Sequence, residues 1–375
     1  MILKLAYRNL FHDRVSLIVT LVGIVFSVVL VAIQLGLYIG SGRLIAAVID
    51  QSKGEIWVVP LGTKNFDDPN ALDGREKHAV LSTPGVQAVA ELAVGFAQWR
   101  KPNGGSTTLL LVGSNPSEGG LTPWNLIEGR VEDLEAPSAI AVDRSYFDEL
   151  GVTKVGEGGE INGSKATVAA ITKGIRSFTT LPYVFLSLPR ARGYLGMAPQ
   201  QASYLLARLE PGADIATVKA AIKSRLPDTE VLTRQEFRDR SLAYWLFETG
   251  AGSALIAGAI LGLIVGLIVV AQTLYASTKD HLNEFATLRA LGASAGYIHR
   301  VILSQALISA VLGYGVGIAV SLAIVYAARD STLPLVLPPG LAGFLLALTI
   351  AMCVLSAMSA ILKVTRIDPA MVFSR

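Results

Sequence analysis

The stretch Lys279–Arg300, KDHLNEFATLRALGASAGYIHR, is a polar island between two long apolar segments. Thr249–Thr278 before it and Val301–Ala328 after it contain no Asp, Glu, Lys, Arg or His. Each segment is longer than the roughly 20 apolar residues that cross a bilayer core. The island therefore lies at a membrane face, and the spacing of its Leu and Phe residues predicts a short helix.

The whole chain has the composition of a membrane protein. Of its 375 residues, 52% are hydrophobic and 16% are charged, and the mean hydropathy is +0.51. Val15–Gly42 and Ser331–Leu362 also lack ionisable side chains, and prolines early in the second segment place the start of its helix near Gly340. Because one charge at a span centre costs about 2.5–3.5 kcal/mol, the sequence predicts four transmembrane helices, at about 15–42, 250–278, 301–328 and 340–362.

The first apolar segment is predicted to be an uncleaved anchor rather than a signal peptide. Its apolar stretch far exceeds the roughly 7–15 residues of a signal-peptide core, and no clear small-residue cleavage site follows it. Residues 1–14 form an amphipathic helix with Leu3, Ala6 and Leu10 on one side. Such a helix can lie in the cytoplasmic interface of the membrane.

Basic residues near the span ends predict the orientation. They gather before the first span, in the island and after the fourth span, at Lys4, Arg8, Arg14, Lys279, Arg289, Arg300, Lys363, Arg366 and Arg375. The connection between the third and fourth spans offers Arg329 beside Asp330. Both termini and the island are therefore expected in the cytoplasm, and residues 43–248 outside. The net charge of +3 reflects this bias and gives no indication of nucleic-acid binding.

The outer segment, residues 43–248, is predicted to fold as a large α+β extracytoplasmic domain. Its strand-like stretches are rich in β-branched and aromatic residues and are separated by Gly, Pro and Asn. They are Gly54–Pro60, Ser106–Gly113, Ala139–Val142, Lys165–Thr172 and Tyr183–Leu188. Helices are expected at Arg144–Leu150 and Ile215–Leu226, with Asp214 as the N-cap of the second.

The sequence shows no catalytic, cofactor or metal site. Gly158–Lys165 is similar to a phosphate-binding loop, but its Lys is one position late and a strand follows, so we interpret it as a turn between strands. The four histidines have no metal-ligand spacing, and Cys353 is an apolar packing residue of the fourth span. An intramembrane enzyme is disfavoured because the spans lack acid, base and nucleophile sets.

Several stretches of the chain resemble a known family of ABC transporter permeases. LSTPGVQAV, IEGRVEDLEAPSAIAVDRSYFDELGV and PYVFLSLPRARGYL resemble the MacB-like periplasmic core domain. YWLFETGAG and the island resemble the FtsX-like permease domain, which would cover 249–375. Within that family the DevC-type branch is most similar, on the pattern Gln272, Tyr275, Asp280, His281, Leu282, Glu284, Phe285, Ala286, Thr287 and Leu288.

The resemblance implies a permease subunit in the bacterial inner membrane. The chain would itself be non-catalytic and would pair with a second copy beside two separate ABC ATPase subunits, which bind the ATP. A periplasmic adaptor protein and an outer-membrane duct are also expected from the DevC-type branch. The implied function is export of a substrate by mechanotransmission. The alternative is a signalling relay that controls a periplasmic partner, such as a cell-wall hydrolase, without moving cargo.

The resemblance also implies that the island docks on the ATPase. The residues predict a helix at about 280–291, with Asp280 as N-cap and Gly292 at its end. Its apolar ridge and flanking charges are Leu282, Phe285, Leu288 and Leu291 with Glu284 and Arg289. The ridge would enter an apolar cleft of the ATPase, and the charges would fix the register. The alternative is a helix that only lies on lipid headgroups.

A row of small residues marks the second span. Gly258, Gly262 and Gly266 recur at four-residue steps, which lets two helix backbones approach closely. The partner helix is either another span of the same chain or the second copy of a dimer, and the sequence does not decide between them. Gln34, Gln272 and Gln305 lie inside spans and are expected to form hydrogen bonds between helices.

Overall fold

The structure, a computed structural model, describes residues 2–281, 284, 287–288, 292–329 and 333–364. The chain divides into two compact units. Ser41–Ala251 forms one unit, which we call the α+β domain, and the residues on either side of it form the other, which we call the helical unit. This matches the predicted fold class, in which a large α+β domain lies between the first and second transmembrane helices.

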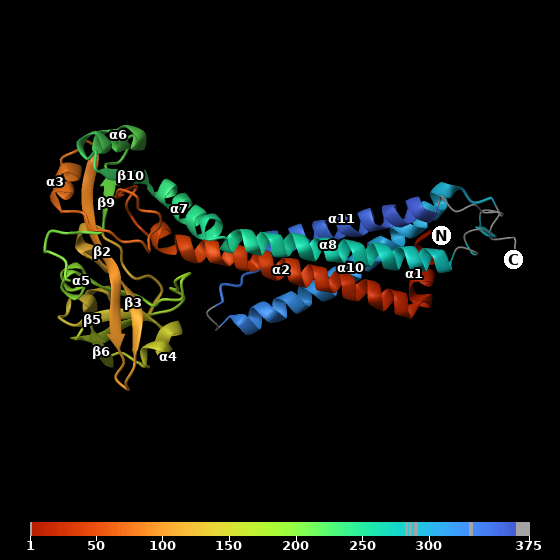
Figure 1. Ribbon diagram of the computed structural model, residues 1–375, viewed down its shortest axis with the longest axis horizontal. Helices are drawn as coiled ribbons and strands as arrows, with labels where there is room; N and C mark the ends of the chain where they lie inside the picture. The colour runs from red at the N-terminus through yellow and green to blue at the C-terminus, as the bar shows by residue number, and fades with distance from the viewer. Residues whose placement is uncertain (1, 282–283, 285–286, 289–291, 330–332, 365–375) are drawn as a thin grey trace. The chain divides into compact units, whose positions relative to one another are not determined.

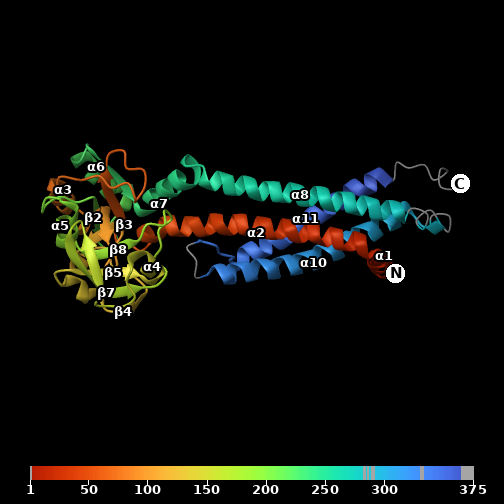
Figure 2. The ribbon, with the colours of Figure 1, turned by 60° about the horizontal axis from the view of Figure 1, so that its bottom comes forward.

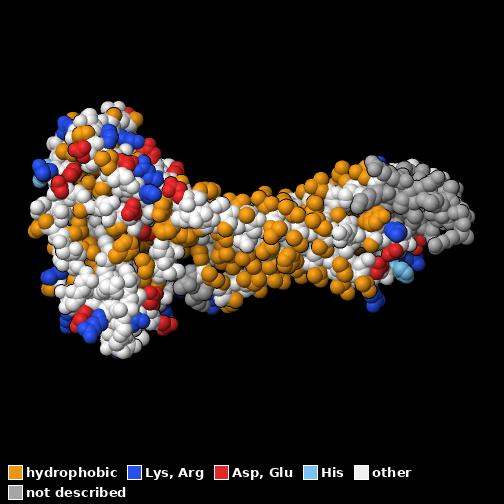
Figure 3. Space-filling model, in the orientation of Figure 1, with side chains coloured by type: hydrophobic (Ala, Val, Ile, Leu, Met, Phe, Trp, Pro, Cys, Tyr) orange, Lys and Arg blue, Asp and Glu red, His pale blue; other side chains and the backbone are white. Residues whose placement is uncertain are grey.

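The helical unit is built from long apolar helices. Its elements are α1 (Ile2–His12), α2 (Arg14–Asp50), α8 (Ala251–Asp280), α10 (Ala295–Ala328) and α11 (Pro339–Val364). Within the described residues, four of them, α2, α8, α10 and α11, are long and apolar enough to cross a membrane. These helices carry exposed apolar side chains such as Ile18, Ile264 and Val316. Figure 3 shows hydrophobic side chains covering most of the visible face of the long helices.

Three helix boundaries differ from the predicted ones. α2 continues through Gly40 and Gly42 to Asp50, past the predicted end at residue 42, because packing buries Ile45, Val48 and Ile49 of the added turns. α8 reaches Asp280, so the prediction that Asp280 caps the next helix is wrong. α10 begins at Ala295 rather than at residue 301, because Ser294 caps it: the Tyr297 N–H donates to the Ser294 side chain over 3.3 Å.

The α+β domain is organised around one ten-stranded mixed sheet. The strand order is β10-β1-β9-β2-β3-β8-β5-β7-β4, and β6 pairs with β2 and β7. The strands are β1 (Ile56–Pro60), β2 (Val86–Arg100), β3 (Ser106–Ser114), β4 (Leu126–Glu128), β5 (Ala139–Asp143), β6 (Gly158–Ile161), β7 (Ser164–Thr172), β8 (Tyr183–Ser187), β9 (Tyr204–Leu209) and β10 (Thr229–Thr233). The pairs β3–β8 and β5–β7 are parallel.

Helices cover parts of the sheet, so its strands are apolar on both faces. The helices are α3 (Arg75–Leu81), α4 (Phe147–Leu150), α5 (Leu188–Leu195), α6 (Ile215–Arg225) and α7 (Arg234–Ala243), with short 3-10 turns at Pro116–Glu118, Val131–Glu135 and Arg144–Tyr146. Along β1, Ile56 and Val58 pack into one core while Trp57 and Val59 pack into another, as the alternation of a strand requires. Figure 1 shows α3 and α6 beside β9 and β10, at the end of the sheet away from α4.

The predicted strands and helices of this domain are present within a few residues, and Asp214 caps α6 through the Thr217 N–H. The stretch that resembles a phosphate loop is the β6–β7 hairpin. Asn162 and Gly163 form its two-residue turn with φ values of 48° and 81°. Both residues have the positive φ of a type I′ turn, so no helix N-terminus faces this loop. The interpretation as a turn between strands is confirmed.

Candidate functional site

The first candidate region is the end of the helical unit where α1, the end of α8 and the start of α10 meet (Figure 2). Asp13 separates α1 from α2 and caps α2, since the Ser16 N–H donates to Asp13 Oδ1 over 3.1 Å. Hydrogen bonds from Ser16 lower the pKa of Asp13, and the nearby His281 acts in the same direction. Asp13 therefore caps the start of α2 as a carboxylate with a lowered pKa.

The end of α8 leads directly into the polar island. The His281 N–H still donates to the Ser277 carbonyl over 3.2 Å, so helical hydrogen bonding continues past Asp280. The His281 side chain is buried, and its Nδ1 lies 3.3 Å from Glu284 Oε2. Glu284 itself is exposed. A carboxylate of the predicted coupling surface is thus held by a buried side chain at the end of span two.

The predicted end of the island helix, at Gly292, has the geometry of a helix terminus. Gly292 has a φ of 95°, and the Ala293 N–H donates to the Leu288 carbonyl over 3.0 Å. This bond across a residue in the left-handed region is the Schellman pattern of a helix end. Leu288 packs partly against the apolar cluster that holds Ala6 and Ile298. Its side chain therefore serves the fold of the helical unit, whether or not it also contacts a partner.

The remaining residues predicted to dock on an ATPase lie outside the described residues: Leu282, Phe285, Arg289 and Leu291. Docking itself stays a prediction for the whole set. Sequence reasoning missed Asp13, although its position directly before an apolar run, three residues ahead of Ser16, is an N-cap signal.

One side of the N-terminal helix α1 packs against α10. Ala6 is fully buried in the same cluster as Ile298 and Val301, and Leu10 is also buried. Leu3, on the same side of the helix, is 69% exposed, so only Ala6 and Leu10 of the predicted apolar side are buried.

The glycines of α8 lie against α2. A Cβ atom on Gly258 would meet Gln34, one on Gly262 would meet Leu30, and one on Gly266 would lie 2.5 Å from the Ser27 Cβ. The Ser27 hydroxyl also donates to the Gly262 carbonyl over 3.0 Å. Of the two partners left open by the sequence, the structure shows a span of the same chain. Figures 1 and 2 both show α2 and α8 side by side.

The second candidate region is the segment of the α+β domain that leads into α8. Its five residues Tyr244–Glu248 form a π-helical turn, a feature found often at functional sites. The Trp245 and Phe178 rings make an edge-to-face contact with 5.4 Å between centroids. Lys64 lies 5.5 Å from the Tyr244 ring centroid and 3.9 Å from the Glu248 carboxylate. The approach to span two is therefore anchored to loops of the domain.

The segment in which α2 ends is anchored in the same way. Val48 and Ile49 are buried in the core of the α+β domain. Arg238 of α7 lies 3.1 Å from the Asp50 carboxylate, and Arg234 donates to the Ser52 carbonyl over 2.9 Å. Within the described part of the chain, no group of His, Cys, Asp and Glu could hold a metal ion.

Two family models match this chain. A model of the MacB-like periplasmic core domain matches residues 17–225, and one of the FtsX-like permease C-terminal region matches residues 256–369. A comparison with curated proteins gave no match. One similar solved structure is the extracellular domain of the noncanonic ABC-type transporter YknZ from Gram-positive bacteria, at 16% identity, 48% of this chain, 99% of that chain and a TM-score of 0.36. Another is the periplasmic region of MacB from Actinobacillus actinomycetemcomitans. It is 13% identical, the match covers 51% of this chain and 94% of that chain, and the TM-score is 0.38.

Proposed function

Since this chain belongs to the family of ABC transporter permeases that carry a MacB-like periplasmic core domain and an FtsX-like permease region, we propose that it couples ATP hydrolysis in a separate ATPase subunit to movement of its α+β domain. The family implies an ABC ATPase partner and a dimeric permease in the bacterial inner membrane. The movement would drive export of a substrate held by the α+β domain. An adaptor protein and an outer-membrane duct would complete the path.

The observation that carries this proposal is the continuity of α2. Its 37 residues form one helix without a break. At a rise of roughly 1.5 Å per residue, such a helix is about 55 Å long, well beyond a bilayer core of about 30 Å. It begins at the Asp13 cap near His281 and ends with Ile49 in the core of the α+β domain. This helix, the rod of the proposal, contributes residues to both units, which supports transmission of force along it to the domain.

The rod can be tested by interrupting it. Three glycines inserted between Arg43 and Leu44 should unwind α2 locally, because glycine loses more backbone entropy in a helix than any other residue. The reporter is a spin label at Lys154→Cys, an exposed turn position, in a Cys353→Ala background that removes the only native cysteine. In the assembled dimer with its ATPase, pulsed electron paramagnetic resonance should show a label-to-label distance that changes when ATP is trapped. The insertion should abolish that change.

The matched control places the same three glycines between Gly104 and Gly105. Both residues lie in an exposed turn, and nothing lies within 4 Å of a Cβ on either of them. The control insertion should keep the ATP-dependent change in distance. If the change also survives the insertion in α2, the rod is not the coupling element and the proposed mechanism is wrong.

Docking of the island needs a separate test, and Leu288 is unsuited to it because that side chain packs within the helical unit. Phe285→Asp alone should prevent co-purification with the ATPase, since an unpaired charge in an apolar cleft costs several kcal/mol. Glu284→Ala removes an exposed carboxylate and should slow ATP turnover without preventing assembly. Normal assembly and turnover of the Phe285→Asp variant would show that the island is not the docking element.

A further inference from the structure

One polar side chain of the second span lies on the surface of the helical unit. Gln272 belongs to α8 and to the apolar run of residues 249–278. It is exposed, and its side-chain amide makes no hydrogen bond with any residue that the structure describes. The other two glutamines of the spans are covered to a greater extent: Gln305 is 4% exposed, and Gln34 lies against Gly258 of α8. Gln272 is therefore the one glutamine of the three that the described helices leave uncovered.

A bilayer makes this exposure unfavourable. Gln272 precedes Lys279 by seven residues, which at a rise of roughly 1.5 Å per residue places it about 10 Å along the helix from that charge. A helical side chain tilts toward the N-terminus of its helix, and in α8 this direction leads away from Lys279 and into the apolar run. Hydrocarbon offers the amide neither donor nor acceptor, so polar side chains within spans face other helices as a rule. The position of Gln272 calls for a protein partner.

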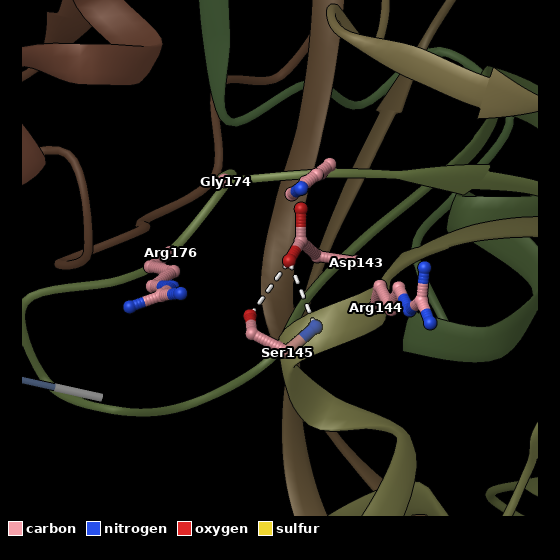
Figure 4. Close-up of a pocket in the computed structure, with 6 residues that line it drawn as sticks. Asp143, Arg144, Ser145, Gly174 and Arg176 are labelled. Carbon is pink, nitrogen blue, oxygen red and sulfur yellow. Dashed lines mark hydrogen bonds between the residues drawn. The ribbon is translucent and has the colours of Figure 1, made fainter. Parts of the chain in front are cut away.

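Polar groups elsewhere in the chain that are removed from water show what Gln272 lacks. In the α+β domain, Asp143 is 2% exposed and accepts hydrogen bonds from the Ser145 N–H and hydroxyl at 3.0 and 2.6 Å (Figure 4). In the helical unit, the Ser27 hydroxyl of α2 and the Ser356 hydroxyl of α11 donate to backbone carbonyls of α8 over 3.0 and 3.1 Å. Hydrogen bonds thus join α8 to α2 and α11, whereas Gln272 lies on the exposed side of α8.

Gln272 ends a row of exposed residues on that side of α8. The members of the row recur at steps of three or four residues, which keeps them on one face of the helix. They are Ala254, Ala257, Leu261, Ile264, Ile268 and Gln272. The two alanines at one end of the row allow a second helix backbone to approach closely, and the glutamine at the other end can donate and accept hydrogen bonds at once. We call this row the α8 seam.

We propose that the α8 seam is the contact between two copies of this chain in the membrane. Two copies with the same orientation are related by a two-fold axis along the spans, so a residue near the axis meets its own counterpart. Two Gln272 side chains can then exchange hydrogen bonds, each donating from its NH₂ group to the carbonyl oxygen of the other. The glycine side of α8 stays with α2 in this arrangement. The seam rests on the proposed function in one respect, that the permease is dimeric.

Disulfide cross-linking of the full-length chain in membranes tests the geometry. Ile268→Cys in a Cys353→Ala background gives one thiol per chain, one helical turn from Gln272. Oxidation with copper phenanthroline and oxygen should join two copies at this position. Val316→Cys in the same background is the matched control, because Val316 of α10 is 52% exposed and Ile268 is 47% exposed. The control should give less than about a tenth of the cross-linked product, since collision in the membrane does not hold two copies in place.

The contribution of the amide is measured as a dissociation constant. Copies labelled with donor or acceptor dyes at Lys154→Cys, again with Cys353→Ala, should show energy transfer in liposomes that falls as the protein is diluted with lipid. Gln272→Leu should raise the dissociation constant about three- to tenfold, the effect of losing hydrogen bonds between helices. Gln272→Asn retains an amide and should recover part of the affinity, which a change in apolar packing alone would not do.

The seam is overturned if Val316→Cys cross-links as well as Ile268→Cys, or if Gln272→Leu leaves the dissociation constant unchanged. Energy transfer between labelled copies without any cross-link at Ile268→Cys would place the contact elsewhere and leave the dimer of the proposed function intact. No energy transfer at any protein density would contradict the dimer itself, and the seam with it. The α2 insertion test separates these cases from a failure of coupling, because it follows a change within an assembled complex.

Discussion

The contacts that stabilise the α+β domain internally differ in kind from those that stabilise the helical unit. In the α+β domain, directional polar bonds join elements far apart in the sequence, as when Arg192 and Lys77 both contact Glu91 of β2 at 2.7 Å. In the helical unit, helices approach closely at glycine. A Cβ on Gly313 of α10 would lie 2.5 Å from Ile24 of α2, and one on Gly317 would lie 2.8 Å from Val28.

This difference bears on how a permease can change conformation while each of its units stays folded. Directional bonds with fixed partners give the domain one arrangement, so it is expected to move as a body. Contacts between glycine and aliphatic side chains have no directional partner to lose when helices shift. The comparison predicts that polar substitutions damage the domain most, whereas added volume damages the helical unit most.

The largest effect is expected at Glu91. This side chain is 9% exposed, and Arg192, its partner at 2.7 Å, is 11% exposed. Glu91→Gln leaves the Arg192 charge largely buried without its carboxylate, which should cost about 3 kcal/mol. Lys77 keeps a second partner, Glu118 at 3.1 Å, so the loss comes mainly from Arg192. The measurement is urea unfolding followed by tryptophan fluorescence, which reports on this domain because all four tryptophans lie within it.

An exposed ion pair of the same domain provides the control. Arg100 and Glu160 are 3.7 Å apart with side chains 76% and 48% exposed. Glu160→Gln should change the free energy of unfolding by less than about 1 kcal/mol, because solvent screens the pair. Equal losses for Glu91→Gln and Glu160→Gln would contradict the idea that buried polar bonds hold the domain.

The second effect concerns added volume in α10. Gly313→Val and Gly317→Val place side chains where α2 already lies, and overpacking of this kind costs about 1–3 kcal/mol. Gly315, on the same helix between them, has nothing within 4 Å of a Cβ. Gly315→Val should therefore retain the parent's yield of folded protein in detergent, measured by size-exclusion chromatography, while the other two variants lose it. The same loss at Gly315 would mean that a second chain covers that face.

Sequence patterns predicted the helical unit well because the membrane imposes a length and an apolar composition that no other fold requires. Runs of residues without charge are enough to predict the four spans and the island. The residues at which the helices end depend instead on local hydrogen bonds. The helix through Asp280 continues because His281 still donates to Ser277, which periodicity cannot reveal. The dimer seam was left undecided because a row of glycines marks close packing without naming the partner, and here the partner is α2.

The α+β domain was predicted only in part, for a physical reason. β2, its longest strand, contains VQAVAELAVGFAQWR, in which Ala, Glu and Gln favour a helix as much as a strand. Its pairing with β3 and β9 decides the structure. Sequence patterns also could not show that the ends of β5 and β7 lie side by side, because that depends on the parallel pairing of two strands that are separated in the sequence.

The smallest of the three effects is a pH dependence confined to the α+β domain. Burial raises the pKa of Asp67 from 3.8 to about 6, although the Tyr183 hydroxyl donates to its Oδ1 over 2.8 Å. A carboxyl with a higher pKa in the folded protein stabilises the fold fully below the unfolded value near 4. That contribution is lost as the pH rises through about 6. The domain should therefore be less stable at pH 8 than at pH 4 on account of this group.

Asp67→Asn isolates the contribution, because an amide oxygen can still accept from Tyr183 and does not titrate. Two pKa units correspond to about 3 kcal/mol, and partial exposure of Asp67 reduces the expected gain to about 1–2 kcal/mol. The variant should be more stable than the parent at pH 8 and equal to it at pH 4, in thermal unfolding followed by tryptophan fluorescence. Asp73→Asn, at a carboxylate 70% exposed, should show no such pH-dependent difference. If the gain for Asp67→Asn is the same at both pH values, it reflects packing and not the buried charge, and polar burial in this domain is weaker than the comparison with the helical unit requires.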